Sequence, residues 1–280
     1  MPLKVPSALC CMNETVKYRR GGAFLEREKR REREWNENQL EGRNAVLEVL
    51  RSGRDIEKIM VQKGNVEGTI KRIVAQAAEK GVVIQEVSRQ KLDELSQTKN
   101  HQGVIALVSA HDYVEVEDIL AAARAKGEDP FIILLDGITD PHNLGAILRT
   151  AECAGAHGVI IPKRRSVGLN ATVGKTSAGA IEYMPVAKVT NLVKTMEQLK
   201  KEGLWFACAD MGENDHFDTN LKGPIGLVIG SEGEGVSRLV KENCDFTASI
   251  PMYGKISSLN ASVAAALLVY EVVRQRNYSK

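Results

Sequence analysis

The sequence predicts an α/β protein with two domains, and three features of the chain lead to this prediction. Between residues 131 and 276, apolar segments of strand length alternate with segments of helix length, which is typical of a mostly parallel sheet covered on both faces. Residues 131–135 form a continuous apolar run, as found in strands buried on both faces. A shorter alternating unit spans residues 40–109. With 280 residues, 43% of them hydrophobic, the chain is long enough to bury a core in each domain.

We expect four segments along the chain: a charged extension at 1–38, a small α/β domain at 39–110, a polar linker at 111–129 and a second domain at 130–280. The extension contains nine Lys or Arg and six Glu, a net charge of +3, while the whole chain carries +2. It lacks a core-facing apolar stripe, so it is expected to be a disordered or loosely helical tail, and contact with RNA phosphates is the alternative. The remaining chain is nearly neutral, so basicity alone does not establish a nucleic-acid partner.

The elements follow from apolar periodicity and from the turn residues between the segments. In the first domain, helices are expected at 45–50, 70–79 and 91–95, and strands at 56–61, 82–87 and 104–108. The linker contains an Ala-rich helix at 116–125. In the second domain, strands are expected at 131–135, 159–161, 204–209, 225–229 and 246–250, and helices at 143–154, 192–200, 236–241 and 262–276.

Composition narrows the classes of protein. No apolar run approaches the roughly 20 residues of a membrane span, and charges occupy the place of a signal peptide's apolar stretch, so we expect a cytoplasmic protein. The five cysteines are scattered and never spaced as zinc-binding pairs. We therefore expect reduced thiols and no metal site.

Residues 136–149 join the first strand of the second domain to its helix. Pro141 and Asn143 suit a helix entrance, where the Asn143 side chain is a candidate cap. Arg149 lies six residues later, about 240° around a regular helix. Arg149 is therefore either a surface residue of the helix or a partner of Asn143 in one site, which requires Asn143 to lie at the frayed end of the helix.

Two strand exits near the C-terminus, 230–235 and 250–262, are expected to form a ligand site. Glycines at 230, 233 and 235 let a ligand approach the backbone closely, but their order differs from the dinucleotide-binding fingerprint. Glu232 and Glu234 would repel phosphates, so the loop suits a ligand without them. Ser258, Asn260 and Ser262 are also candidate caps of the helix that follows.

Two further segments allow alternative interpretations. Gly174, Lys175 and Thr176 are similar to the end of a loop that binds nucleoside triphosphates, but Leu169 stands where that motif requires glycine. The basic run 163–165 follows a strand end. It is either a solvated loop or a phosphate contact at the edge of the sheet where ligands bind.

Together, residues 140–149, 229–233 and 250–264 resemble the three ordered motifs of the SpoU (TrmH-like) RNA ribose 2′-O-methyltransferases of the SPOUT superfamily. The preceding module, with 41–46 near its start and 101–104 near its end, resembles the substrate-binding domain of the RlmB-type subgroup. That subgroup methylates a guanosine ribose in bacterial 23S rRNA. The charged extension lies outside the resemblance.

The resemblance implies a catalytic domain with a deep trefoil knot, preceded by a small α/β domain like ribosomal protein L30e. It also implies S-adenosylmethionine bound in the knot, structured RNA as substrate, rRNA above all, and a homodimer with its active sites near the subunit interface. The implied catalytic residues are Arg149, Asn143, Glu232, Ser258 and Asn260, and the implied cofactor contacts are Gly230, Ile250 and Leu259. Candidate RNA contacts are Arg43, Lys163, Arg164 and Arg165.

Chemistry restricts the role of Arg149. A ribose hydroxyl must lose its proton as it attacks a methyl group, but a guanidinium is effectively always protonated and has no lone pair. We therefore expect Arg149 to clamp an RNA phosphate rather than to act as a literal base. The alternatives are a tRNA ribose methyltransferase, an rRNA methyltransferase conferring antibiotic resistance, a catalytically silent RNA-binding assembly factor and a phosphate-binding NTPase.

Overall fold

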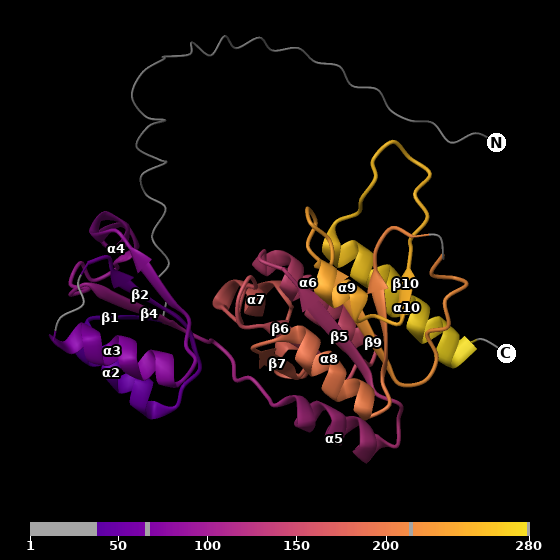
Figure 1. The fold of residues 1–280 in the computed structure, drawn as a ribbon, viewed down its shortest axis with the longest axis horizontal. Helices are drawn as coiled ribbons and strands as arrows, with labels where there is room; N and C mark the ends of the chain where they lie inside the picture. Colours follow the sequence, from indigo (N-terminus) through magenta and orange to yellow (C-terminus); the bar gives the residue numbers. More distant parts are fainter. Residues whose placement is uncertain (1–37, 65–67, 213–214, 279–280) are drawn as a thin grey trace, which may run out of the picture. The chain divides into compact units, whose positions relative to one another are not determined.

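The computed structural model describes residues 38–64, 68–212 and 215–278, and Figure 1 traces its elements. The charged extension expected at 1–38 lies outside these residues, apart from Asn38. The described chain builds two sheets, a four-stranded one from residues 39–108 and a six-stranded one from residues 131–248. No helix in the described ranges is both long and apolar enough to cross a bilayer.

The N-terminal sheet is mixed, with the strand order β1-β4-β2-β3. Strand β4 pairs antiparallel with β1 and β2, whereas β2 and β3 run parallel. The strands are β1 (Gln39–Glu41), β2 (Ile56–Gln62), β3 (Ile84–Val87) and β4 (Val104–Val108).

Helices cover both faces of this sheet, because successive side chains of a strand point to opposite faces. On one face, Ile59 and Val61 of β2 belong to the same buried cluster as residues of α2 (Arg43–Ser52) and α3 (Gly68–Glu79). On the other face, Met60 packs with Leu92 of α4 (Arg89–Leu95). The N-terminal domain therefore has a core on each side of its sheet.

The C-terminal sheet has the strand order β10-β8-β9-β5-β6-β7, and every neighbouring pair is parallel. Its central strands are apolar throughout, which suits burial on both faces. The strands are β5 (Phe131–Asp136), β6 (Gly158–Pro162), β7 (Val186–Val189), β8 (Trp205–Ala209), β9 (Ile225–Gly230) and β10 (Phe246–Ala248).

Two hydrophobic clusters sandwich this sheet, and β5 contributes alternate residues to each. Ile133 and Leu135 pack with α6, α7 and α10, whereas Ile132 and Leu134 pack with α5, α8 and α9. The helices are α5 (Val116–Lys126), α6 (Pro141–Cys153), α7 (Ala171–Thr176), α8 (Leu192–Lys201), α9 (Arg238–Glu242) and α10 (Ala261–Tyr278), with the 3-10 turn η1 (Ala180–Glu182) after α7.

The predicted α/β class with a mostly parallel sheet is confirmed. Every helix and strand expected between residues 45 and 276 occurs, with small shifts at its ends. The elements that were not predicted are β1, β7, α7 and η1. Helix α5, expected within the linker, buries Ile119 and Leu120 in the same cluster as the central strand. The domain boundaries stay predictions.

The N-terminus of α6 differs from the expectation. Asp140, not Asn143, caps the helix by accepting a hydrogen bond from the His142 amide at 3.0 Å, and Pro141 occupies the first turn. The cap places Asn143 inside the first turn, where the residue is 9% exposed. Asn143 is therefore free to interact with residues outside its own helix.

Candidate active site

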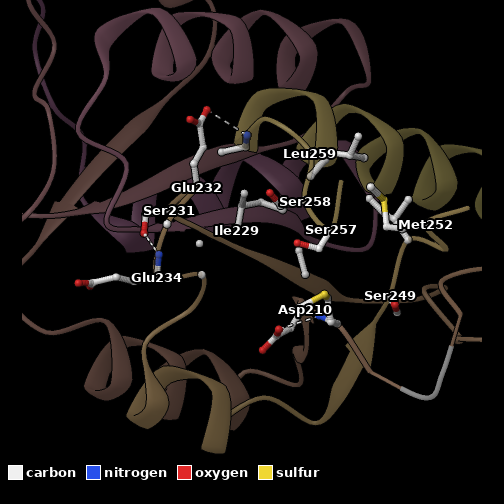
Figure 2. A pocket seen from close by; sticks show the side chains of 18 of the residues that line it. Asp210, Ile229, Ser231, Glu232, Glu234, Ser249, Met252, Ser257, Ser258 and Leu259 are labelled. Carbon is white, nitrogen blue, oxygen red and sulfur yellow. Dashed lines mark hydrogen bonds between the residues drawn. The ribbon is translucent and has the colours of Figure 1, made fainter. Parts of the chain in front are cut away.

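A pocket of about 340 Å³ opens at the carboxyl ends of β8, β9 and β10. Parallel strands bring their carboxyl ends to one edge of a sheet, which is where open α/β folds bind ligands. The pocket is lined by residues 209–211, 229–235, 248–250, 252 and 257–259 and by the first turn of α10. Figure 2 shows Ser231, Glu232 and Glu234 on one side and Met252 and Leu259 on the other.

The loop after β9 is a tight turn fixed by its own backbone. Ser231 and Gly235 exchange two backbone hydrogen bonds of 3.1 and 3.0 Å, and the Glu234 amide donates to the Ser231 hydroxyl at 3.3 Å. A Cβ atom on Gly230 would overlap the backbone of Gly235 and Val236. Glycine at 230 is therefore required for the turn to fold back along the pocket wall.

Three of the predicted catalytic residues form one hydrogen-bonded cluster beside the pocket. The Asn143 amide group donates to Glu232 Oε1 at 2.9 Å, and Asn260 Nδ2 donates to Asn143 Oδ1 at 3.0 Å. Asn260 Nδ2 also donates to Glu232, and the Ala261 amide approaches the same carboxylate at 3.4 Å. We call Asn143, Glu232 and Asn260 the polar cluster. It joins α6, the β9 loop and the start of α10.

Asn260 also caps α10. Its Oδ1 accepts hydrogen bonds from the Ser262 amide at 2.9 Å, the Ser262 hydroxyl at 2.6 Å and the Val263 amide at 3.3 Å. Of the three candidate caps, Asn260 is thus the one that the structure uses. Both ends of its side-chain amide are engaged, which fixes its orientation.

The structure keeps Arg149 apart from this cluster. Arg149 is exposed on α6, and within the described ranges its guanidinium makes no hydrogen bond or ion pair. Ser258 lines the pocket from an exposed position, and its hydroxyl likewise has no hydrogen-bond partner among the described residues. Gly230, Ile250 and Leu259, the predicted cofactor contacts, all line the pocket.

The candidate RNA contacts differ in their surroundings. Arg164 and Arg165 are exposed after β6, and Lys163 is half-buried. Arg43 starts α2 in the N-terminal domain. Gly174, Lys175 and Thr176, which resembled the end of a nucleoside-triphosphate-binding loop, lie in helix α7. They therefore do not form a phosphate-binding loop.

Sequence reasoning missed the contribution of β8 to the pocket. Asp210 and Met211 follow this strand and line the wall. Asp210 accepts a hydrogen bond from the Met211 amide at 2.7 Å and pairs with Lys241 at 2.5 Å. The hydrogen bond from Lys241 to Asp210, together with the negative charge of Asp210, raises the pKa of Lys241. The signal was available, since a strand ending at 209 opens onto the same edge as the other two.

The described residues contain no group of three or more His, Cys, Asp or Glu placed to hold a metal ion. The cysteines they contain, Cys153, Cys208 and Cys244, are free. A hydrogen bond with Cys244 lowers the pKa of the Cys208 thiol, although its burial acts in the opposite direction.

Two family models match the chain. Residues 130–270 match the SpoU rRNA methylase family, and residues 39–114 match the RNA 2′-O ribose methyltransferase substrate-binding family. The TrmH-family protein YacO of Bacillus subtilis strain 168, whose name leaves tRNA and rRNA open as substrates, is 51% identical over 84% of this chain and 95% of its own. A TrmH-family relative from Staphylococcus saprophyticus is 48% identical over 85% and 95%.

Solved structures of SpoU methyltransferases are also similar to this chain. The SpoU methyltransferase AviRb from Streptomyces viridochromogenes is similar with a TM-score of 0.54 and 25% identity, covering 85% of this chain and 89% of that one. AviRb has also been solved in complex with S-adenosylmethionine, and that structure is 24% identical with the same TM-score. This chain belongs to the SpoU/TrmH family of RNA methyltransferases.

Proposed function

We propose that the protein methylates a ribose 2′-hydroxyl in RNA with S-adenosylmethionine as methyl donor, acting on a guanosine of bacterial 23S rRNA. The observation that carries the proposal is the polar cluster of Asn143, Glu232 and Asn260 beside the pocket at the carboxyl edge of the sheet. A ligand pocket and a preorganised set of polar side chains at one edge are what a group-transfer site requires.

The pocket suits S-adenosylmethionine, which has a purine and a sulfonium but no phosphate. Its wall combines apolar side chains, such as Ile250 and Leu259, with backbone groups of the tight loop after β9. Glu232 and Glu234 add negative charge, which disfavours phosphates and favours a cation. At about 340 Å³ the pocket falls within the range of small-molecule sites.

When bound, S-adenosylmethionine supplies an electrophilic methyl group. The protein must then orient the ribose and assist loss of the hydroxyl proton. Arg149 is exposed and unpaired within the described ranges, so its guanidinium is available to hold an RNA phosphate. We propose that it clamps the phosphate beside the target ribose and that the proton passes to this phosphate or to water.

The polar cluster has a positioning role in this scheme. Glu232 is held by Asn143, Asn260 and the start of α10, so its carboxylate has a fixed direction at the mouth of the pocket. A carboxylate fixed in this way can accept a hydrogen bond from a ribose hydroxyl. We propose Ser258, whose hydroxyl lies on the pocket wall and has no partner in the described part of the chain, as a contact to the cofactor.

The choice of rRNA rests on the N-terminal domain, which matches the substrate-binding family. A tRNA substrate is the alternative, since YacO is named for both RNAs. We propose Arg43, Lys163, Arg164 and Arg165 as RNA contacts.

We also propose a homodimer. Val263, Leu267 and Tyr270 of α10 are 47%, 45% and 50% exposed and follow one another at helical spacing, which makes an apolar stripe on the surface. Because α10 begins at the polar cluster, a partner on this stripe would lie close to the site. The trefoil knot and the L30e-like classification of the first domain are proposals of the same kind, and they rest on the family resemblance.

The test is transfer of a tritiated methyl group to unmodified 23S rRNA and, separately, to unmodified tRNA transcripts. We expect the wild-type protein to methylate 23S rRNA at a guanosine ribose. Arg149→Ala should lower kcat/KM by about 100-fold, the scale of a lost electrostatic contact, while calorimetry shows unchanged S-adenosylmethionine binding.

Arg124→Ala, which removes an exposed arginine of α5 paired with Glu202, is the matched control and should keep wild-type activity. Transfer to tRNA alone would replace the rRNA assignment. A folded protein that binds the cofactor but transfers no methyl group to either RNA would contradict the enzymatic proposal.

A further inference from the structure

A second cavity, of about 420 Å³, lies entirely within the N-terminal domain. It is bounded by the start of α2, the end of β2, helix α4 and the loop before β4. Its lining is almost wholly polar, unlike that of the pocket at the C-terminal sheet. The residues that the argument uses are Arg43, Arg89, Asp93, Lys99, His101 and Gln102.

The cavity carries a net positive charge. Arg43, Arg89 and Lys99 contribute three cations, and Asp93 is the single carboxylate among the lining residues that the structure describes. Asp93 already accepts a hydrogen bond from His101 at 2.9 Å and lies 4.0 Å from Arg89. Lys99 is exposed, and its ammonium has no hydrogen bond or ion pair within the described ranges. The cavity therefore presents uncompensated positive charge in a domain that is otherwise mixed in sign.

One carboxylate anchors the loop that carries Lys99. Glu41 accepts hydrogen bonds from the Gln97 amide at 2.6 Å, the Ser96 hydroxyl at 2.7 Å, the Thr98 amide at 3.2 Å and the Thr98 hydroxyl. The Asn100 amide continues the chain of contacts by donating to the Thr98 hydroxyl at 3.2 Å. The loop is thus fixed at its start, directly before the cavity.

The far end of the loop is fixed by a buried histidine. His101 is 6% exposed, and its Nδ1 accepts a hydrogen bond from the Gly103 amide at 3.0 Å, so Nε2 carries the proton donated to Asp93. Between the anchors, Lys99 and Gln102 have φ angles of 58° and 51°, a region that non-glycine residues occupy at a cost.

Gln102 joins the loop to α2. Its Oε1 accepts from the Arg43 amide at 3.2 Å, and its carbonyl accepts from Arg43 Nε at 3.2 Å. The second bond fixes the guanidinium of Arg43 at the cavity and leaves its terminal nitrogens for another acceptor. The loop is held at both ends in a strained form that brings a lysine and two arginines around one space.

We propose that this cavity binds a phosphate-bearing nucleotide of the RNA substrate, with the phosphodiester held by Arg43, Arg89 and Lys99. The inference rests on the proposed function and assigns to particular residues the substrate contact of the N-terminal domain. The volume accommodates a nucleotide and not only an anion. Arginine and lysine side chains at a preformed polar site are the usual way in which proteins hold RNA phosphates.

The experiment compares two double variants that each remove two positive charges from the N-terminal domain. Arg89→Gln/Lys99→Gln alters the cavity. Lys71→Gln/Lys91→Gln is the matched control, since both lysines are exposed on α3 and α4 and neither lines the cavity. Affinity for an unmodified 23S rRNA transcript is measured by filter binding at several salt concentrations.

The cavity variant should raise Kd by about tenfold or more and lower the slope of log K against log salt by about 1 to 2, as expected for lost phosphate contacts. Cofactor affinity and kcat at saturating RNA should stay at wild-type values, so the effect falls on KM. The control variant should bind RNA almost as the wild type does.

Equal Kd values for the cavity and control variants would overturn the proposal. Full displacement of RNA by inorganic phosphate at matched phosphate concentration would also overturn it, because the cavity would then be a site for free anions. Failure of the cavity proposal can be distinguished from failure of the proposed function. A wild-type protein that binds RNA through this cavity but transfers no methyl group would remove the enzymatic proposal and leave the binding site standing.

Discussion

Glu41 shows how much a single side chain can organise. Burial on its own would raise the pKa of this carboxyl, but hydrogen bonds from Thr98, Gln97, Ser96 and Gln39 outweigh it and lower the pKa to about 2. The ionised form is therefore the one that the fold stabilises. Because the same bonds fix the start of the loop that carries Lys99, Glu41 is a positioning residue for that cation of the N-terminal cavity.

This pKa predicts how stability depends on pH. A carboxyl whose folded pKa is depressed stabilises the fold above its unfolded pKa, near 4.5, and loses that contribution as pH falls toward about 2. Glu41→Gln should therefore lower the free energy of unfolding by about 1–2 kcal/mol at pH 7, and the difference from wild type should shrink between pH 4.5 and 2.

Urea unfolding at a series of pH values measures this difference. Glu48→Gln is the control, because Glu48 is exposed and its pair with Arg51 is a surface pair worth little. A stability difference for Glu41→Gln that is the same at pH 7 and pH 2.5 would contradict the role assigned to the ionised carboxylate.

For single residues, the sequence predicted which ones lie at the pocket and in the polar cluster better than it predicted their contacts. The 240° separation of Asn143 and Arg149 agrees with the structure, where Asn143 is buried and Arg149 is exposed. The cap of α6 was assigned to Asn143, but Asp140 takes it. Both residue types cap helices well, so composition alone cannot choose between positions three residues apart.

Helix α6 depends on one close contact with α7. A Cβ atom on Gly145 would overlap the Thr176 side chain and approach the Ser177 amide nitrogen to 2.9 Å. Glycine is therefore required here by packing and not by backbone conformation. This contact holds α6, which carries Asn143 and Arg149, against its neighbour.

Gly145→Ala should destabilise the protein by about 1–3 kcal/mol through overpacking, although alanine favours helices, and should lower Tm in calorimetry. Adding Thr176→Ala should recover part of the loss, because it removes the side-chain overlap and leaves the backbone contact. An unchanged or higher Tm for the single variant would show that α6 and α7 pack less tightly than described.

Short elements were the ones that sequence reasoning missed. Strand β7 has four residues and includes Lys188, and α7 has six residues in a stretch that resembled a phosphate-binding motif. Strand β1 has three residues and forms only because β4 supplies its partner. Such segments carry too few residues to show a period, and their structure depends on tertiary contacts that are distant in sequence.

At the scale of the whole molecule, the parallel sheet was predictable because its strands are apolar on both faces. Ile132 and Leu134 belong to one cluster and Ile133 and Leu135 to the other. The order of the strands was not predictable, since periodicity is local and gives no information on which strands become neighbours. A knot likewise leaves no periodic trace, and here only the family resemblance implies it.

The apolar stripe on α10 predicts the state of assembly. Leu267→Asp should place a charge in the proposed subunit contact and convert the homodimer to a monomer in analytical ultracentrifugation, with reduced methyl transfer. Leu239→Asp, on an exposed residue of α9, is the control and should remain dimeric. A wild-type protein that sediments as a monomer at micromolar concentration would contradict the dimer proposal.

Helix α10 also runs from the carboxyl ends of the strands of the C-terminal sheet to their amino ends. Its first turn is capped by Asn260 at the polar cluster, and near its end Arg276 donates to the carbonyls of Asp129 at 3.0 Å and Pro130 at 3.1 Å, just before β5. Both ends of α10 are therefore fixed to the domain by hydrogen bonds. An affinity tag attached behind Tyr278 would start from the amino ends of the strands, whereas the pocket lies at their carboxyl ends, so C-terminal immobilisation should leave the pocket accessible for binding measurements.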